Sequence, residues 1–202
     1  MWNAAIAPTL ASRSATRRAL LEAAGLPVAA EPAAIDERRL EEEFLRSGGN
    51  SQQVGPALAR AKAIEVSARR PGALCIGADQ TLLLADVLFH KPETMAGAAR
   101  SLAALSGRTH VLIAAVCVAR DGAIVFEAHD RAHLTMRALD EAAILRYCAA
   151  AGPGILSSVG AYQIEGIGIH LFETIEGEHA TVLGLPLLPL LKGLRAQGLL
   201  AL

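Results

Sequence analysis

Aromatic residues and net charge are both scarce in this sequence of 202 residues, and each scarcity excludes a class of protein. Phe, Trp and Tyr together make up 3% of the chain, so the core must consist mainly of aliphatic side chains. The formal net charge is -1, which argues against a general nucleic-acid or membrane-surface binder. An anionic ligand therefore has to be bound by a local cluster of basic side chains.

Cysteine is also rare. Cys75, Cys117 and Cys148 form no CxxC pair and lie in apolar surroundings, so we expect buried thiols rather than a disulfide framework. The first residues do not read as a signal peptide, and no stretch is long and uncharged enough to span a membrane. These features predict a soluble cytoplasmic protein.

Apolar residues, in contrast, are abundant at 52%, enough for a sizeable core, and the length fits one domain or two closely packed lobes. Helix-like segments are expected at residues 15–24, 38–45, 54–68, 94–105 and 140–150, and from about residue 186. Strand-like segments are expected at residues 28–34, 73–76, 81–85, 111–119, 123–135 and 169–173, with a hairpin at residues 120–122. The alternation predicts an α/β fold with a mixed sheet.

The most informative stretch runs from residue 73 to residue 92. Its first apolar run predicts a buried strand with Asp79 at the carboxyl end, where ligands usually bind in α/β proteins. A second apolar run leads to His90, Lys91 and Pro92. An acid and a lysine placed in this way are suited to a metal and a phosphate. On spacing alone, however, the alternative is favoured, in which Asp79 opens a turn and Lys91 is a solvated loop residue.

Residues 15–24 predict a helix whose first turn is basic. Ser14 is a suitable N-cap, and Arg17 and Arg18 follow three and four residues later. The unpaired amides at a helix N-terminus bind anions, so this turn is a candidate phosphate site. The alternative is that both arginines are simply solvated, against the helix dipole.

Three further charged residues have two interpretations each. Asp36 and Glu37 are either acids at the start of a helix or metal ligands, and position alone favours the first role. Lys62 lies on an amphipathic helix, where a lysine usually faces solvent. Its neighbours Ala61 and Ala63 are small, however, which would let it approach another element closely.

Several separated segments agree with one protein family. In chain order they are Leu10–Ser14 with Arg17, Ile35–Glu37, Ala61–Ala63, Gly77–Gln80, His90–Pro92, Leu105–His110, Gly160–Tyr162 with Glu165-Gly166, and Ile175–Gly177 with Gly184–Pro186. Each segment is weak alone, but the ordered set spans nearly the whole chain. This set resembles the Maf proteins, nucleoside triphosphate pyrophosphatases that are also associated with septum formation.

The resemblance implies a fold and an activity. The implied fold is a single domain over residues 1–202, with an elongated mixed sheet, flanking helices and two lobes around a cleft, related to the inosine triphosphate pyrophosphatases. The implied reaction cleaves a nucleoside triphosphate between its α- and β-phosphates, with Mg²⁺ or Mn²⁺ as cofactor. A homodimer is also implied, whereas neither nucleic acid nor membrane is an expected partner.

The resemblance also implies roles for individual residues. Asp79 is the expected proton acceptor that activates water, and Asp36 and Glu37 join it as expected metal ligands. The expected phosphate-binding and substrate-binding residues are Ser14, Arg17, Arg18, Lys62, Gln80, Lys91, Arg108 and Glu165.

The chain departs from the family pattern at several of these places. Thr16 stands where an arginine is usual, Ser158 where a lysine is frequent, and Glu165 where a glutamine is frequent. The glutamine directly after the acid, Gln80, is similar to the residue of the family branch that acts on modified guanine nucleotides such as 7-methyl-GTP. The lost charges leave a second hypothesis open, a catalytically weakened nucleotide-binding regulator of cell division.

Overall fold

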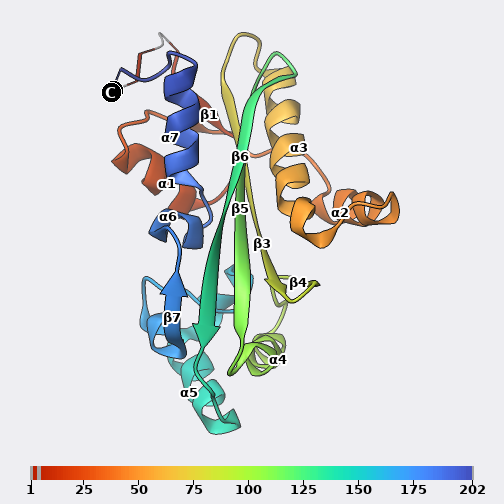
Figure 1. Ribbon diagram of the computed structural model, residues 1–202, viewed down its shortest axis with the longest axis vertical. Helices are drawn as coiled ribbons and strands as arrows, with labels where there is room; N and C mark the ends of the chain where they lie inside the picture. Colours follow the sequence, from red (N-terminus) through yellow and green to blue (C-terminus); the bar gives the residue numbers. More distant parts are fainter. Residues whose placement is uncertain (1, 4–5, 202) are drawn as a thin grey trace. The chain divides into compact units, whose positions relative to one another are not determined.

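The computed structural model describes residues 2–3 and 6–201, which form a mixed α/β fold (Figure 1). The strands are β1 (Thr9–Leu10), β2 (Ala29–Ala30), β3 (Cys75–Leu84), β4 (Val87–Phe89), β5 (Thr109–Arg120), β6 (Ala123–Met136) and β7 (Phe172–Glu176). The α-helices are α1 (Ala15–Ala23), α2 (Glu37–Arg46), α3 (Val54–Arg69), α4 (Met95–Leu105), α5 (Glu141–Ala151), α6 (His179–Val182) and α7 (Leu187–Ala196). Short 3₁₀ helices are η1 (Ser51–Gln53), η2 (Gly152–Ser157) and η3 (Ile167–Leu171).

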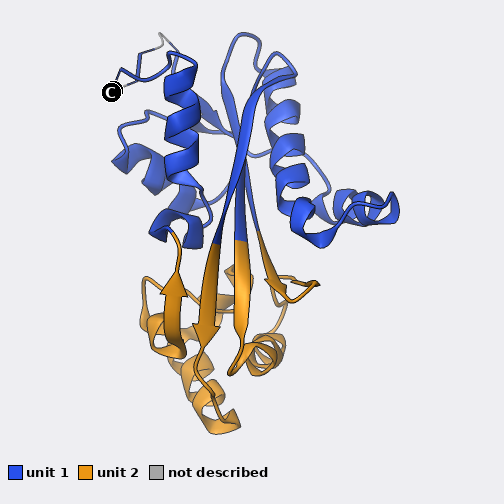
Figure 2. Ribbon diagram, viewed as in Figure 1, with its two compact units in different colours: residues 1–80, 113–131, 178–202 blue, residues 81–112, 132–177 orange. Residues whose placement is uncertain are grey.

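The chain divides into two compact units (Figure 2). Unit 1 contains residues 1–80, 113–131 and 178–202, and unit 2 contains residues 81–112 and 132–177. Strands β3, β5 and β6 contribute residues to both units. The single domain predicted over residues 1–202 stays a prediction.

The sheet is mixed, as the sequence predicted. Its strand order is β2-β1-β3-β5-β6-β7, and β4 pairs with β3. Strand β1 runs parallel to both β2 and β3, whereas β4 is antiparallel to β3 and β7 is antiparallel to β6. Asp121 and Gly122 have φ angles of 51° and 77° between β5 and β6, which is the backbone of a type I′ hairpin. The predicted hairpin at residues 120–122 is therefore confirmed.

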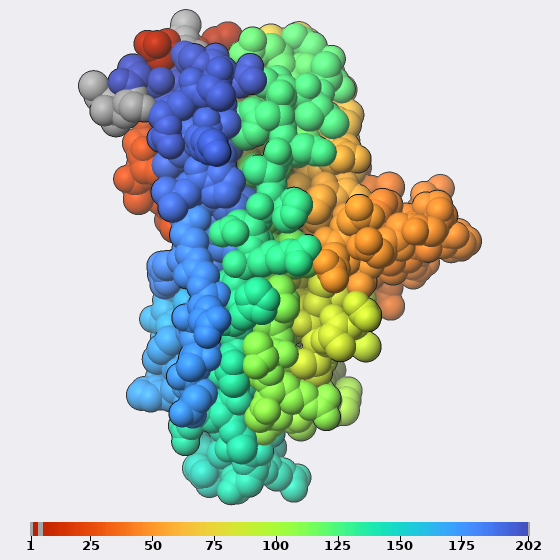
Figure 3. Space-filling view, viewed as in Figure 1, coloured from red at the N-terminus to blue at the C-terminus, as the bar shows by residue number. Residues whose placement is uncertain are grey.

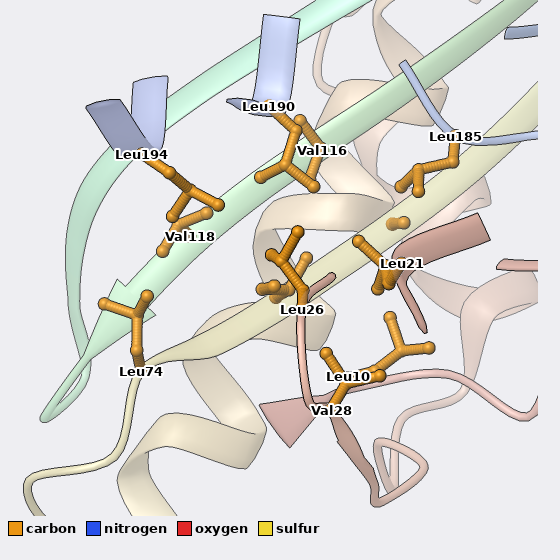
Figure 4. Packing of buried hydrophobic residues seen from close by; sticks show 12 residues of the cluster. Leu10, Leu21, Leu26, Val28, Leu74, Val116, Val118, Leu185, Leu190 and Leu194 are labelled. Atoms are coloured by element: carbon orange, nitrogen blue, oxygen red, sulfur yellow. The ribbon is translucent and has the colours of Figure 1, made fainter. Parts of the chain in front are cut away.

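The main core of unit 1 is aliphatic and lies on one face of β3 and β5 (Figure 4). Leu21 of α1 and Leu190 and Leu194 of α7 pack there against Val116 and Val118 of β5. All five side chains are nearly or fully buried. Figure 3 shows α7 against β6 on the visible face of this unit, where Gly193 lets the helix lie directly on the ring of Phe126. Leucine and valine side chains thus form most of this core, as the low aromatic content of the sequence predicted.

Helix α3 covers the opposite face of β3 through small side chains. Ala59 and Ala63 of α3 pack with Ala115, Cys117 and Ala119 of β5, and all are fully or almost fully buried. Such small residues allow a helix to approach a sheet closely, and this approach positions the polar residues described below.

Unit 2 contains an aromatic cluster besides its buried aliphatic residues. The rings of His110, Tyr162 and Phe172 lie 4.8–6.0 Å apart between centroids. His110 Nε2 and the Tyr162 hydroxyl are hydrogen-bonded at 2.7 Å, and both residues are buried. Three of the chain's few aromatic or imidazole rings therefore gather at one place.

Most helices begin and end within two residues of the predicted bounds, but three strands differ from prediction. The two apolar runs around Asp79 form one continuous strand, β3, so this acid lies inside the strand and not at its end. The strand expected at residues 28–34 contains only Ala29–Ala30, and the one expected at residues 169–173 begins at Phe172 after a 3₁₀ turn. Strand β3 accommodates Asp79 and Gln80 because Lys62 and the carbonyls of α6 are their hydrogen-bond partners.

Within the described ranges, none of the helices combines the length and the apolar character needed to cross a bilayer.

Candidate active site

The centre of the candidate site is a buried pair of opposite charges in unit 1. Lys62 on α3 places its Nζ atom 2.6 Å from Oδ1 of Asp79 on β3. The two side chains are 8% and 9% exposed. Glu37, at the first position of α2, brings its Oε2 atom to 2.9 Å from the same Nζ atom, although its own side chain is 55% exposed. One ammonium group therefore joins two carboxylates.

Gly77 makes this pairing possible. A Cβ atom at residue 77 would lie 2.2 Å from the carbonyl oxygen of Ala59 and 2.5 Å from the backbone nitrogen of Ala63. Only glycine therefore fits between β3 and α3 at their present separation. Because Lys62 precedes Ala63 and Asp79 follows Gly77 by two residues, this contact sets the distance between the two charges.

Burial changes the acidity of these groups. Desolvation raises the pKa of Asp79 above its usual range, although the neighbouring positive charges of Lys62 and Arg17 oppose the shift. A carboxylate with a raised pKa accepts a proton more readily than an exposed aspartate does. Burial also lowers the pKa of the Arg17 guanidinium, while Asp79 and Glu37 oppose that shift.

Arg17 is held by the backbone around the N-terminus of α1. Ser14 is the N-cap, and its hydroxyl accepts a hydrogen bond of 3.2 Å from the Arg17 amide. The Arg17 Nε atom donates to the Gly184 carbonyl at 2.8 Å, and Nη1 donates to the Ala78 carbonyl at 2.9 Å and to Ser12 Oγ at 3.3 Å. Within the described ranges, Nη2 has no hydrogen-bond partner. Arg17 is therefore a fixed positive charge beside a helix N-terminus, which suits an anion.

Gln80 is fixed by the end of helix α6. Its Nε2 atom donates to the carbonyl oxygens of Thr181 and Val182, at 2.9 Å and 3.0 Å. A Cβ atom at Gly184 would lie 3.4 Å from Gln80 Oε1 and 3.5 Å from Arg17 Nε. Gly184 thus lies against both side chains.

The acidic residues that were expected to bind metal differ in their surroundings. Asp36 is the N-cap of α2, and its Oδ1 atom accepts a hydrogen bond of 3.0 Å from the Arg39 amide. Glu37 and Asp79 instead face the same ammonium group. Among residues 2–3 and 6–201, no three His, Cys, Asp or Glu side chains gather in a way that would hold a metal ion. A hard cation such as Mg²⁺ usually binds one or two carboxylates together with substrate phosphates, so the donor chemistry of Glu37 and Asp79 fits such an ion.

Arg18 lies outside this group. It forms an exposed ion pair with Glu22, at 2.7 Å between Nε and Oε1, one turn further along α1. Its expected contact with phosphate stays a prediction.

Three other expected substrate residues belong to unit 2. Lys91 follows β4, Arg108 precedes β5, and Glu165 lies in the loop before η3; all three are exposed. None of their side chains forms a hydrogen bond or ion pair with a described residue. Their roles also stay predictions.

The sequence did not reveal two structural contributors to the site. One is Gly77, whose lack of a side chain brings Lys62 to Asp79. The other is α6, which no strong hydrophobic pattern marks and whose carbonyls hold Gln80. The sequence signals that could have pointed to them are Gly77 and Gly184, the glycines of the segments Gly77–Gln80 and Gly184–Pro186.

The fold and the site together define a class: an α/β protein with a buried acid–lysine pair beside a basic helix N-terminus, suited to an anionic substrate. Residues 8–197 match the family model described as "Maf-like protein". The chain therefore belongs to the Maf family, and the prediction from the sequence motifs is confirmed.

Named relatives cover almost the entire chain. One, named "7-methyl-GTP pyrophosphatase" in Mesorhizobium japonicum, is 55% identical over 189 residues, 94% of this chain and 95% of the relative. A protein of the same name in Brucella abortus is 51% identical over 188 residues, 93% of this chain and 94% of the relative. A "Nucleoside triphosphate pyrophosphatase" of Nitrobacter hamburgensis is 51% identical over 203 residues, 100% of this chain and 99% of the relative.

Proposed function

We propose that this chain cleaves a nucleoside triphosphate between the α- and β-phosphates, releasing a monophosphate and diphosphate. The class of activity is that of its relatives: the chain is a nucleoside triphosphate pyrophosphatase, a hydrolase that acts on an acid anhydride. The observation that carries the proposal is the buried Asp79–Lys62 pair with Arg17 beside it. Phosphoryl transfer depends mainly on positioning and on neutralising charge, and this group is suited to both.

In this proposal each residue has a separate task. Asp79, with its raised pKa, accepts the proton of the attacking water. Lys62 and Arg17 offset the charge that develops on the phosphate oxygens. Ser14 keeps the first turn of α1 in place, so that its free amides also face an anion.

A divalent cation completes the proposed site. Asp79 and Glu37 would hold Mg²⁺ or Mn²⁺ with the substrate phosphates, and Asp36, the third expected ligand, caps α2 directly before Glu37. When bound, such an ion neutralises phosphate charge and orients the reacting oxygens.

The preferred substrate in this proposal is a modified guanine nucleotide, 7-methyl-GTP. Two observations support it: the names of relatives that are 51–55% identical, and the presence of Gln80 directly after the acid. Lys91, Arg108 and Glu165 are proposed to contact the same nucleotide. We also propose a cytoplasmic location, which agrees with three buried free thiols, and a homodimer as the family resemblance implies.

A diphosphate-release assay tests the proposal. Purified protein is incubated with Mg²⁺ or Mn²⁺ and with 7-methyl-GTP, GTP, dTTP, UTP or CTP, and diphosphate and orthophosphate are measured separately. Wild-type protein is expected to release diphosphate, fastest from 7-methyl-GTP. Asp79→Asn is expected to lose at least about 100-fold in rate, the contribution of a general base.

The matched control is Asp86→Asn, since Asp86 is an exposed aspartate in the turn after β3. It should keep wild-type activity. Orthophosphate as the product would refute the assigned bond, and an active Asp79→Asn variant would refute the assigned base. Nucleotide binding without any release would favour the regulator hypothesis instead.

A further inference from the structure

The short helix α6 ends in a backbone arrangement that presents carbonyl groups to the site. The Leu185 amide donates to the Ala180 carbonyl at 2.9 Å, and the Gly184 amide donates to the Thr181 carbonyl at 3.0 Å. Gly184 has a φ angle of +95°. These features define a Schellman motif, for which glycine is the usual residue at this position.

Two substrate-site side chains bind to this helix end. Gln80 donates to the Thr181 and Val182 carbonyls, and Arg17 donates to the Gly184 carbonyl. Carbonyls at the end of a helix carry the negative end of its dipole, and the Thr181 carbonyl, which accepts from the Gly184 amide, has a second lone pair for Gln80. One short element thus orients both a phosphate candidate and a base candidate.

The two carbonyls determine how the Gln80 amide is turned. Only an NH₂ group can donate to both oxygens, because an amide oxygen placed there would face two other acceptors. Gln80 Oε1 is therefore the atom that remains for a ligand. An acceptor in this position selects a nucleobase that offers a donor, such as the N1–H or the amino group of a guanine.

Helix α6 needs an anchor, because four residues do not form a stable helix in isolation. Its residues Ala180 and Val182 are buried, and Thr181, which is fully buried, provides a polar anchor. Its Oγ1 atom donates a hydrogen bond of 2.8 Å to Oδ2 of Asp130 on β6. This bond ties α6 to the sheet at the residue whose carbonyl receives the Gln80 amide.

We propose that Thr181 is a positioning residue for base selection, acting through its hydrogen bond to Asp130 and through the Gln80 amide. This inference rests on the proposed pyrophosphatase function, because selection is meaningful only for a nucleotide site. Thr181 touches no substrate. It fixes the acceptor that does.

A double-mutant cycle tests the coupling. We expect Thr181→Val to lower kcat/KM for 7-methyl-GTP about 10-fold, close to the effect of one lost hydrogen bond to a charged group. It should change kcat/KM for the triphosphate of unsubstituted purine riboside, whose base offers no donor, less than about 3-fold. Thr181→Ser keeps the hydroxyl and should restore the wild-type ratio between the two substrates. Added to Gln80→Ala, Thr181→Val should cause no further loss of selectivity, because coupled residues are not additive.

A spectroscopic measurement tests the same idea without turnover. In wild-type protein the side-chain NH₂ group of Gln80, identified by its absence in Gln80→Ala, should give two dispersed NMR signals with slow hydrogen exchange. In Thr181→Val the pair should move to the position of a solvated glutamine. Thr135→Val is the matched control, since it removes a hydroxyl that is hydrogen-bonded to Thr109 in unit 2. It should leave the Gln80 signals unchanged.

Asp130 is a half-exposed residue of β6, and Asp130→Ala removes the same hydrogen bond by deleting its acceptor. This variant replaces Thr181→Val if Thr181→Val does not fold. Three results would overturn the proposal. The first is a loss by Thr181→Val that is equal for both substrates, the second is a loss that adds to that of Gln80→Ala, and the third is an unchanged pair of Gln80 amide signals. An inactive wild-type protein would refute the pyrophosphatase function and base selection together, whereas the NMR result would still report whether Thr181 fixes the amide.

Discussion

Replacing Gly77 with alanine should disturb both stability and catalysis through one contact. The new Cβ atom would lie 2.2 Å from the Ala59 carbonyl oxygen and 2.5 Å from the Ala63 nitrogen. Both are backbone atoms of α3, so no side chain can rotate away. To reach an ordinary contact distance, α3 must retreat from β3 by about 1 Å, a strain that typically costs about 1–3 kcal/mol. For a chain of this length this corresponds to a fall of about 3–10 °C in Tm.

The same displacement acts on Lys62, which precedes Ala63. Its Nζ atom is now 2.6 Å from Asp79, and a shift of about 1 Å would weaken this contact. Misplacement on this scale can cost about 100-fold in rate, so we expect kcat/KM for 7-methyl-GTP to fall 10- to 100-fold.

Calorimetry and the diphosphate-release assay together check this reasoning. Gly154→Ala is the matched control, because a Cβ atom at Gly154 would meet nothing within 4 Å and its φ angle is not positive. It should keep both Tm and rate. A Gly77→Ala variant with wild-type Tm would refute the close approach of α3 to β3. A lowered Tm with an unchanged rate would refute the link between that approach and the charge pair.

Two further predictions concern buried ionisable groups. Lys62→Met should lower the free energy of unfolding by about 3–5 kcal/mol at pH 7, because it leaves the buried Asp79 carboxylate unpaired, and the loss should shrink at acid pH as Asp79 takes up a proton. Burial lowers the pKa of His110 from 6.5 to about 4, so the unfolded chain binds more protons between these values. The contribution of neutral, buried His110 to the free energy of unfolding is therefore fully present above pH 6.5. The free energy of unfolding should fall by up to about 3 kcal/mol as the pH drops to about 4.

Denaturant unfolding at several pH values measures both effects. Arg60→Met is a control for the first, since Arg60 lies on the same helix in an exposed pair with Glu127, and exposed pairs contribute about 1 kcal/mol or less. An equal loss in both variants would contradict the role of burial. For the second, His110→Gln retains a hydrogen-bonding partner for Tyr162 but does not titrate. If its stability depends on pH as strongly as that of wild-type protein, another group is responsible.

Patterns in the amino-acid sequence were sufficient to predict the fold class, the family and most helix bounds. Periodic apolar residues specify a helix locally, so α1, α3 and α7 followed from spacing, Ser14 and the position of Pro186. Asp36 likewise proved to be the N-cap that its position favoured. The ordered motifs identified the Maf family because they depend on residue identity and order, which the sequence contains in full.

The way in which β3 accommodates Asp79 and Gln80 depends on contacts between elements that are distant in the sequence. A strand interrupted by Asp79 and Gln80 reads as two apolar runs, because nothing local satisfies either side chain. Lys62, from α3, and the carbonyls of α6, a hundred residues further on, provide the partners.

Tertiary structure also decided which of the two basic residues Lys62 and Arg18 is buried. Both are basic residues on helices, and their spacing does not distinguish them. Gly77 allows α3 to approach β3, which buries Lys62 against Asp79, whereas Arg18 remains on the exposed side of α1 with Glu22. The physical reason is that burial depends on which faces of distant elements meet, and no local pattern encodes that contact.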